Sequence, residues 1–145
     1  MSDTPTLTGQ DIGQAERATR ALLDRVLAEV QTTFHQSVVL NLTANAAAPP
    51  EVEGMATRMA QGLKIDRPMA RRAIDELVAG GLVSLSGDPA SLALTADGEA
   101  RFAAIRHGID QIAERLYGDL PPEDLATAHR ILAIVTERAN AELSA

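Results

Sequence analysis

Residues 65–83, IDRPMARRAIDELVAGGLV, hold the most informative pattern in the chain. Asp66 is a good N-cap, and Pro68 falls in the first turn, where a missing N–H costs a helix little. Apolar residues then recur at helical spacing until two glycines end the segment: Met69, Ala73, Ile74, Leu77 and Val78. The pattern predicts a short helix with one side toward the core and three arginines on the other: Arg67, Arg71 and Arg72.

The neighbouring segments turn this helix into a recognisable unit. On its N-terminal side, Met55, Met59 and Leu63 repeat at four-residue intervals and predict another short helix, over Gly54–Gly62, which Gly62 ends. On its C-terminal side, the apolar runs 82–85 and 92–94 flank the turn-forming residues 86–89, which predicts a small hairpin. Two short helices followed by a hairpin are typical of a winged helix-turn-helix.

Longer helices are expected on both sides of this unit. Thr8 and Asp11 form a loose capping pair before a helix at 9–31, and a densely apolar helix follows over Phe34–Leu42. After Thr95, and again after Pro121, apolar residues alternate by three and four, as in the seam of a helical bundle. Either this seam is buried within one subunit or it joins two subunits, and we favour dimerisation because a domain this small offers the outer helices little cover.

We therefore expect a mainly α fold: a winged helix-turn-helix with a small β-hairpin wing, flanked by N- and C-terminal dimerisation helices. Residues 1–145 would form a single unit, with a DNA-binding lobe at 33–95 and dimerisation helices at 9–31 and 96–143.

Charge is distributed unevenly along the chain. The formal net charge is −7, yet the segment 58–72 holds five basic residues and one acidic residue, so it carries +4 and the rest of the chain −11. A basic patch on an acidic body argues against indiscriminate nucleic-acid binding and favours one localised contact with a polyanion.

The sequence argues against several classes of protein. The chain has no cysteine, which excludes thiolate catalysis, cysteine-ligated zinc and a disulfide scaffold. Residues 1–10 do not resemble a signal peptide, and no apolar run approaches the roughly 18 residues of a membrane helix, so we expect a cytoplasmic protein without a membrane partner. We find no nucleophile beside a histidine and no phosphate loop, so we expect neither an enzyme nor a cofactor. The three histidines, His35, His107 and His129, are scattered and predict no metal site.

The candidate DNA-binding residues cluster around the arginine helix. Its basic side chains lie in the first half, the part that enters a major groove, and arginine suits this place because its fork bonds guanine O6 and N7 or bridges phosphates. The alternative is a solvated helix face whose arginines pair with Asp75 and Glu76. The candidate set is Arg58, Lys64, Arg67, Pro68, Arg71 and Arg72.

The sequence resembles the MarR family of transcription regulators. The stretch IDRPMARRAIDELVAGGLV is similar to that family's recognition helix, LTADGEA at 94–100 to the opening of its helix after the wing, and residues 34–42 to its second helix. The resemblance implies a homodimer that places two recognition helices in successive major grooves of double-stranded DNA. It also implies release by a small aromatic effector, for which the candidate pocket residues are Phe34, His35, Val38 and His107.

Three departures from the family pattern leave a second interpretation open. The wing tip, Ser86–Ser91, has no basic residue; the link Ala60–Ile65 is longer than the usual tight turn; and the family's tryptophan is replaced around Ser37. The alternative is a dimeric winged-helix scaffold or ligand-sensing module that does not bind DNA.

Overall fold

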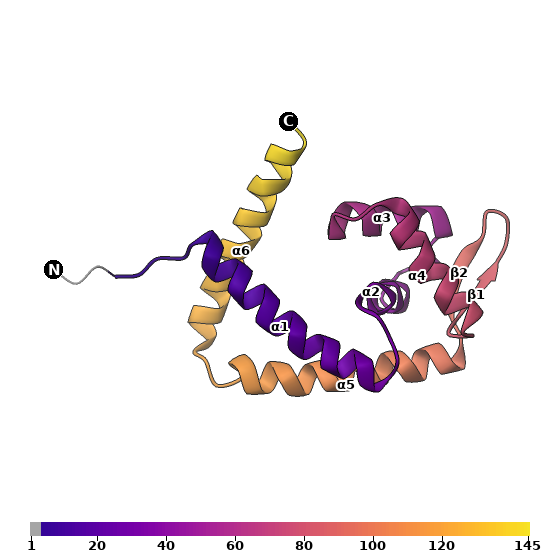
Figure 1. Ribbon diagram of the computed structural model, residues 1–145, viewed down its shortest axis with the longest axis horizontal. Coiled ribbons are helices and arrows are strands. Elements are labelled where there is room, and N and C mark those ends of the chain that lie inside the picture. The colour runs from indigo at the N-terminus through magenta and orange to yellow at the C-terminus, as the bar shows by residue number, and fades with distance from the viewer. Residues whose placement is uncertain (1–3) are drawn as a thin grey trace. The chain divides into compact units, whose positions relative to one another are not determined.

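The computed structural model describes residues 4–145. Within this range the elements are α1 (Gly9–Glu29), α2 (Phe34–Ala44), α3 (Val52–Leu63), α4 (Arg67–Ala79), β1 (Val83–Ser86), β2 (Ser91–Leu94), α5 (Ala96–Tyr117) and α6 (Pro122–Leu143) (Figure 1). The chain divides into two compact units, the first ending at Asp110 and the second comprising Gln111–Ala145. The predicted mainly helical winged helix-turn-helix with a two-stranded wing is confirmed.

The starts of α1 and α4 follow the capping residues read from the sequence. Thr8 and Asp11 form a complete capping box at the start of α1; at α2 the structure adds a second one, of Thr33 and Gln36, that was not predicted. The Asp66 carboxylate accepts a 2.9 Å hydrogen bond from the Met69 amide and thereby caps α4. The bond at Asp66 sets where α4, the arginine-bearing helix, begins.

The turn between α3 and α4 is shorter than predicted. Helix α3 continues through Gly62 to Leu63, and Lys64 ends it in the left-handed conformation with φ of 57°. The Lys64 ammonium donates a 2.8 Å hydrogen bond to the Gln61 carbonyl, which satisfies one of the open acceptors at the helix end. The predicted long link at 60–65 is therefore wrong: three residues, 64–66, connect the two helices.

The core of the first unit gathers around α2, which packs against α1, α3, α4 and β2 (Figure 1). Its α4 side is the stripe Ala70, Ala73, Ile74 and Leu77, each at most 2% exposed. Met55 and Met59 of α3 are buried as predicted, but Met69 is 40% exposed. The prediction of a core role for Met69 is wrong because the buried stripe of α4 begins one residue later, at Ala70.

The wing is tied to the rest of the first unit at its base. Strands β1 and β2 pair antiparallel from Val83↔Leu94 to Ser86↔Ser91. The Val52 amide donates to the Ala90 carbonyl and the Leu92 amide to the Pro50 carbonyl, so the chain entering α3 runs along β2. These bonds hold the hairpin beside the α3–α4 pair.

The start of α5 packs closely against the beginning of the hairpin. The Thr95 hydroxyl donates a 2.7 Å bond to the Gly81 carbonyl and accepts a 3.0 Å bond from the Gly98 amide. Gly98 is buried, and a Cβ there would overlap the backbone carbonyl of Leu82. Thr95 and Gly98, the threonine and the glycine of LTADGEA, thus both allow α5 to dock closely on the wing.

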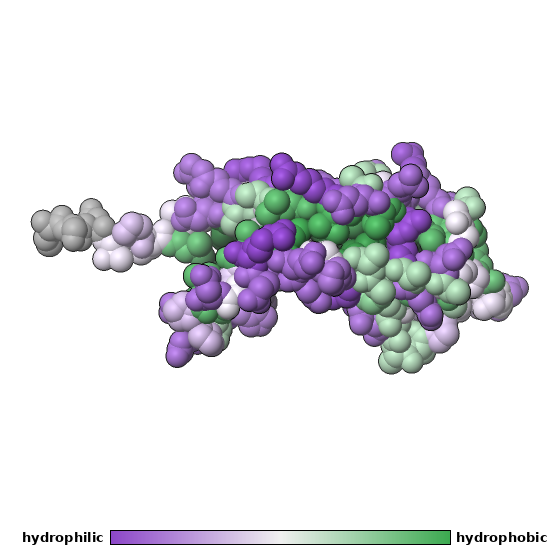
Figure 2. Space-filling view, turned by 90° about the horizontal axis from the view of Figure 1, so that it is seen from below, coloured by the Kyte–Doolittle hydropathy of each residue, from purple (hydrophilic) through white to green (hydrophobic). Residues whose placement is uncertain are grey.

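The second unit leaves much apolar surface uncovered in the single chain. Helix α6 has no buried residue. Large hydrophobic side chains exposed in this unit are Leu116, Tyr117, Leu120, Ile131, Leu132, Ile134, Val135 and Leu143. Figure 2 shows hydrophobic residues at the surface on one face of the chain, among hydrophilic ones. Within residues 4–145, no helix combines the length and apolar composition of a membrane span.

We predict that Gly98→Ala lowers the stability of the protein by about 1–3 kcal/mol, because the new methyl group must displace the Leu82 backbone. Thermal unfolding followed by circular dichroism measures this change. Gly62→Ala is the matched control: nothing lies within 4 Å of a Cβ at that helical position, so it should leave the melting temperature unchanged or raise it. Equal melting temperatures for Gly98→Ala and the unchanged protein would contradict the close docking of α5.

Candidate nucleic-acid interface

All six predicted DNA-contact residues are exposed and lie along one stretch of the helix-turn-helix. Arg58 is on α3, Lys64 is in the turn, and the remaining four are on α4: Arg67, Pro68, Arg71 and Arg72. Because the buried stripe Ala70–Leu77 faces the core, the opposite side of α4 is presented outward. The exposed Met69 adds an apolar group to the same first turns of α4.

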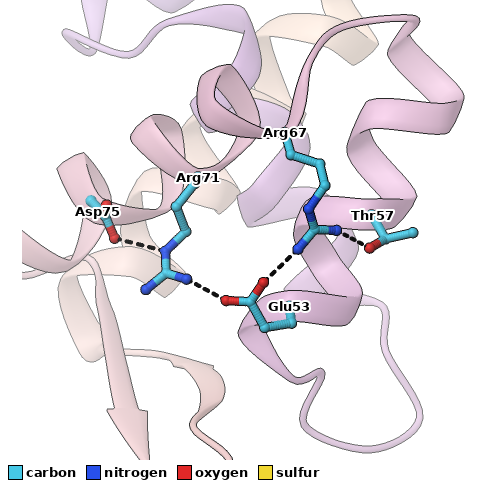
Figure 3. A network of polar contacts seen from close by, with 5 residues as sticks. All are labelled: Glu53, Thr57, Arg67, Arg71 and Asp75. Atoms are coloured by element: carbon cyan, nitrogen blue, oxygen red, sulfur yellow. Dashed lines mark hydrogen bonds and ion pairs between the residues drawn. The ribbon is translucent and has the colours of Figure 1, made fainter.

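Two of these arginines meet carboxylates of the chain itself (Figure 3). Arg71 Nη1 lies 2.5 Å from Glu53 Oε1, and Arg71 Nε lies 3.2 Å from Asp75 Oδ1. Arg67 pairs with the other oxygen of Glu53 and donates to the Thr57 hydroxyl. A single α3 carboxylate thus joins arginines one turn apart on α4.

These ion pairs are exposed, which limits their strength. The side chains of Arg67 and Arg71 are 46% and 44% exposed, and those of Glu53 and Asp75 are 66% and 61% exposed. Exposed pairs contribute about 0–1 kcal/mol because water competes for both partners. The pairs therefore order the two guanidinium groups without withdrawing them from an incoming ligand.

The other basic side chains have no such partner. Among residues 4–145, no carboxylate pairs with Arg58, Lys64 or Arg72. Of the two partners named by the alternative interpretation, Asp75 pairs with Arg71, whereas Glu76 pairs with no arginine in the same range. Along α4 lies an open hollow of about 520 Å³ lined by Pro68, Arg71, Arg72, Asp75, Glu76 and Ala79. Its basic residues belong to the first half of α4 and its acidic residues to the second, as the sequence predicted.

Glu53 and Thr57 were not among the site residues predicted from the sequence. Their spacing of four residues places them on one exposed face of α3, away from the buried positions Met55 and Met59. The tight turn at 64–66 and the packing of both helices on α2 decide which face of α3 adjoins the first turns of α4. The sequence pattern of α3 alone does not predict that orientation.

No family model and no curated protein matches the chain. Solved structures match it along almost its whole length. The chain is similar to Staphylococcus aureus MarR in complex with salicylate and kanamycin, with a TM-score of 0.79 and 14% identity over 92% of this chain and 90% of that one. It is also similar to apo MarR from E. coli, with a TM-score of 0.68 and 22% identity over 91% and 98% of the two chains. Bordetella bronchiseptica BpsR, whose DNA binding is regulated by 6-hydroxynicotinic acid, gives a TM-score of 0.72 and 20% identity over 94% and 97%.

The chain has the MarR fold. The resemblance inferred from residues 65–83 and 94–100 is thus confirmed as a likeness of fold, with α4 at the place of the predicted recognition helix.

A separate cavity of about 220 Å³ lies within the first unit of this MarR fold. Of the four predicted effector residues it includes Phe34 and Val38, whereas His35 and His107 are not among its lining. The other lining residues are Leu23, Ser37, Asn41, Phe102, Ile105, Arg106 and Ile109. The Arg20 guanidinium stacks over the Phe34 ring, 3.3 Å from its centroid. The cavity is therefore mainly apolar, with polar groups at Ser37, Asn41 and Arg106.

Proposed function

We propose that this MarR-fold chain is one subunit of a dimeric transcription regulator that binds specific double-stranded DNA through α4. The observation that carries the proposal is the outward display of arginines on the first half of α4. The neighbours in fold, E. coli MarR and BpsR among them, support it.

The exposed residues of α4 match the chemistry of a major groove. A guanidinium fork bonds guanine O6 and N7, and an apolar group such as Met69 packs against the thymine methyl. Arg72, Arg58 and Lys64, which have no carboxylate partner among residues 4–145, provide charge for the phosphates. The second half of α4 is acidic, with Asp75 and Glu76. Because the DNA phosphates repel these carboxylates, the helix would enter the groove with its first half foremost.

Dimerisation explains the apolar surface of the second unit. A row that includes Leu132 and Val135, 44% and 40% exposed, is unfavourable in water and favourable between two copies. Two copies related by a twofold axis would present two α4 helices to a pseudo-palindromic site.

The 220 Å³ cavity suits a small aromatic effector. A cavity of about 150 Å³ admits a benzene ring, so the space around Phe34, Val38 and Phe102 accommodates one ring with polar substituents. Salicylate, present in the complex of S. aureus MarR, and 6-hydroxynicotinic acid, which regulates DNA binding by BpsR, are both small aromatic acids. Because the cavity is lined by α1, α2 and α5, a ligand there would bias the position of α2, on which α4 packs.

The DNA proposal is tested with a duplex from upstream of the protein's own gene, in fluorescence anisotropy at two salt concentrations. Binding should weaken steeply as salt rises: the logarithm of the association constant should fall against the logarithm of the salt concentration with a slope of about 0.9 per phosphate contact. Arg72→Ala should weaken binding and lower the salt slope by about 1, because one phosphate contact is lost. Arg25→Ala, the same charge change on exposed α1, is the control and should have little effect. Equal binding by Arg72→Ala and Arg25→Ala would remove α4 from the interface.

The dimer proposal predicts that the chain elutes at twice 15.3 kDa in light-scattering chromatography. Leu132→Glu combined with Val135→Glu should give a monomer, because two buried charges at the interface lack partners. Helical content should be retained, since neither side chain is buried in the single chain. A wild-type monomer at micromolar concentration would contradict the proposal.

The effector proposal predicts that salicylate or 6-hydroxynicotinate binds the protein in titration calorimetry and lowers its affinity for the duplex. Ser37→Phe should fill the cavity and abolish this binding, while DNA binding without ligand persists. Undiminished ligand binding by Ser37→Phe would place the effector elsewhere.

A further inference from the structure

Glu53 occupies an unusual position for an acidic residue at an interface with a polyanion. Both of its carboxylate oxygens are engaged, one by Arg71 at 2.5 Å and the other by Arg67 (Figure 3). Arg71 is held from its opposite edge by Asp75 at 3.2 Å, and Arg67 by the Thr57 hydroxyl. We call these five residues, Glu53, Thr57, Arg67, Arg71 and Asp75, the Glu53 clamp.

The basic patch contains arginines that are paired with carboxylates in the clamp and basic residues that lie outside it. Within the clamp, two positive charges face two negative charges, so the group is neutral as a whole. Arg58, Lys64 and Arg72 stay outside it, with no ion pair to any carboxylate of residues 4–145. Attraction to a phosphate backbone of any sequence therefore depends on the second group alone.

Phosphates and base edges differ in how they interact electrostatically with the clamped arginines. A phosphate that approaches Arg71 also approaches the Glu53 carboxylate, and the two anions repel each other. The guanine edge is neutral and offers two acceptors to the free part of the guanidinium fork, so it experiences no such repulsion. A clamped fork also loses less rotational freedom on binding than a free one, because it is already held in one orientation.

We propose that Glu53 is a specificity-determining residue: it holds Arg67 and Arg71 for reading bases and opposes their use as phosphate contacts. The inference rests on the proposed DNA-binding function. It goes beyond that function because it assigns discrimination between sites to an acidic side chain that adds nothing to electrostatic attraction.

The test compares two duplexes: a site selected by the wild-type protein from a random library, and a shuffled sequence of the same length and composition. Glu53→Gln keeps the shape and one acceptor oxygen but removes the charge. It should raise affinity for the shuffled duplex about tenfold and change affinity for the selected site much less, so that the ratio of the two falls. The salt slope on the shuffled duplex should also rise by about 1–2, because Arg67 and Arg71 become phosphate contacts.

Two controls separate the clamp from general charge effects. Glu51→Gln removes the same charge two residues away, on an exposed side chain that makes no ion pair among residues 4–145; it should leave the affinity ratio and the salt slope near the wild-type values. In an Arg67→Ala, Arg71→Ala background, Glu53→Gln should no longer alter the ratio, because its partners are absent.

The outcomes are distinguishable. If the wild-type protein selects no site, the proposed function itself fails. If it selects one and Glu53→Gln leaves the ratio unchanged, or shifts both affinities equally as Glu51→Gln does, the role of Glu53 is overturned. Thermal melting of Glu53→Gln within a few degrees of wild type shows that the comparison is made on folded protein.

Discussion

The burial of one narrow stripe of α4 governs the rest of this structure. Ala70, Ala73, Ile74 and Leu77 are almost completely withdrawn from water, and two of the four are alanines. Small side chains let α4 approach α2 and α3 closely, and the stripe leaves the helix only one orientation. The direction in which the outward face of α4 points, its arginines included, follows from this burial.

The same orientation brings α3 into the electrostatics of α4. The tight turn at 64–66 sets the two helices side by side, so the polar face of α3 delivers Glu53 and Thr57 to the first turns of α4. Local charge here differs from the charge of the segment: residues 58–72 carry +4 in sequence, but Glu53 and Asp75 offset two of those charges in space. Because the side chains of Arg67, Arg71, Glu53 and Asp75 are each at least 44% exposed, a ligand can alter this balance.

The wing and α5 form a second constraint, made of backbone contacts. The Thr95 hydroxyl bridges Gly81 and Gly98, and the absent Cβ of Gly98 admits the Leu82 carbonyl. With the bonds between 50–52 and β2, these contacts join the hairpin to α3 and α5 at once. The cavity around Phe34 and Phe102 lies in the same unit, so its walls and the support of α4 share α2.

The residues by themselves determined the secondary structure to a large extent. Capping residues such as Thr8 and Asp66, the apolar spacing of α3 and α4, and the turn residues after Leu85 act within a few positions of one another, so their effects can be read along the chain. The errors have equally local causes: Lys64 rather than Gly62 ends α3, and the buried stripe starts at Ala70 rather than Met69. The exposed position of the six candidate DNA-contact residues also followed from the pattern.

Only the tertiary structure decided which distant groups meet. Glu53 lies 14 residues from Arg67 and 18 from Arg71, and nothing in their spacing predicts a shared carboxylate. The cavity likewise takes Phe34 and Val38 but leaves out His35 and His107, because neighbours in sequence on a helix point in different directions. Contacts between elements depend on how helices cross, and helix crossing is set by the packing of the whole core rather than by any one segment.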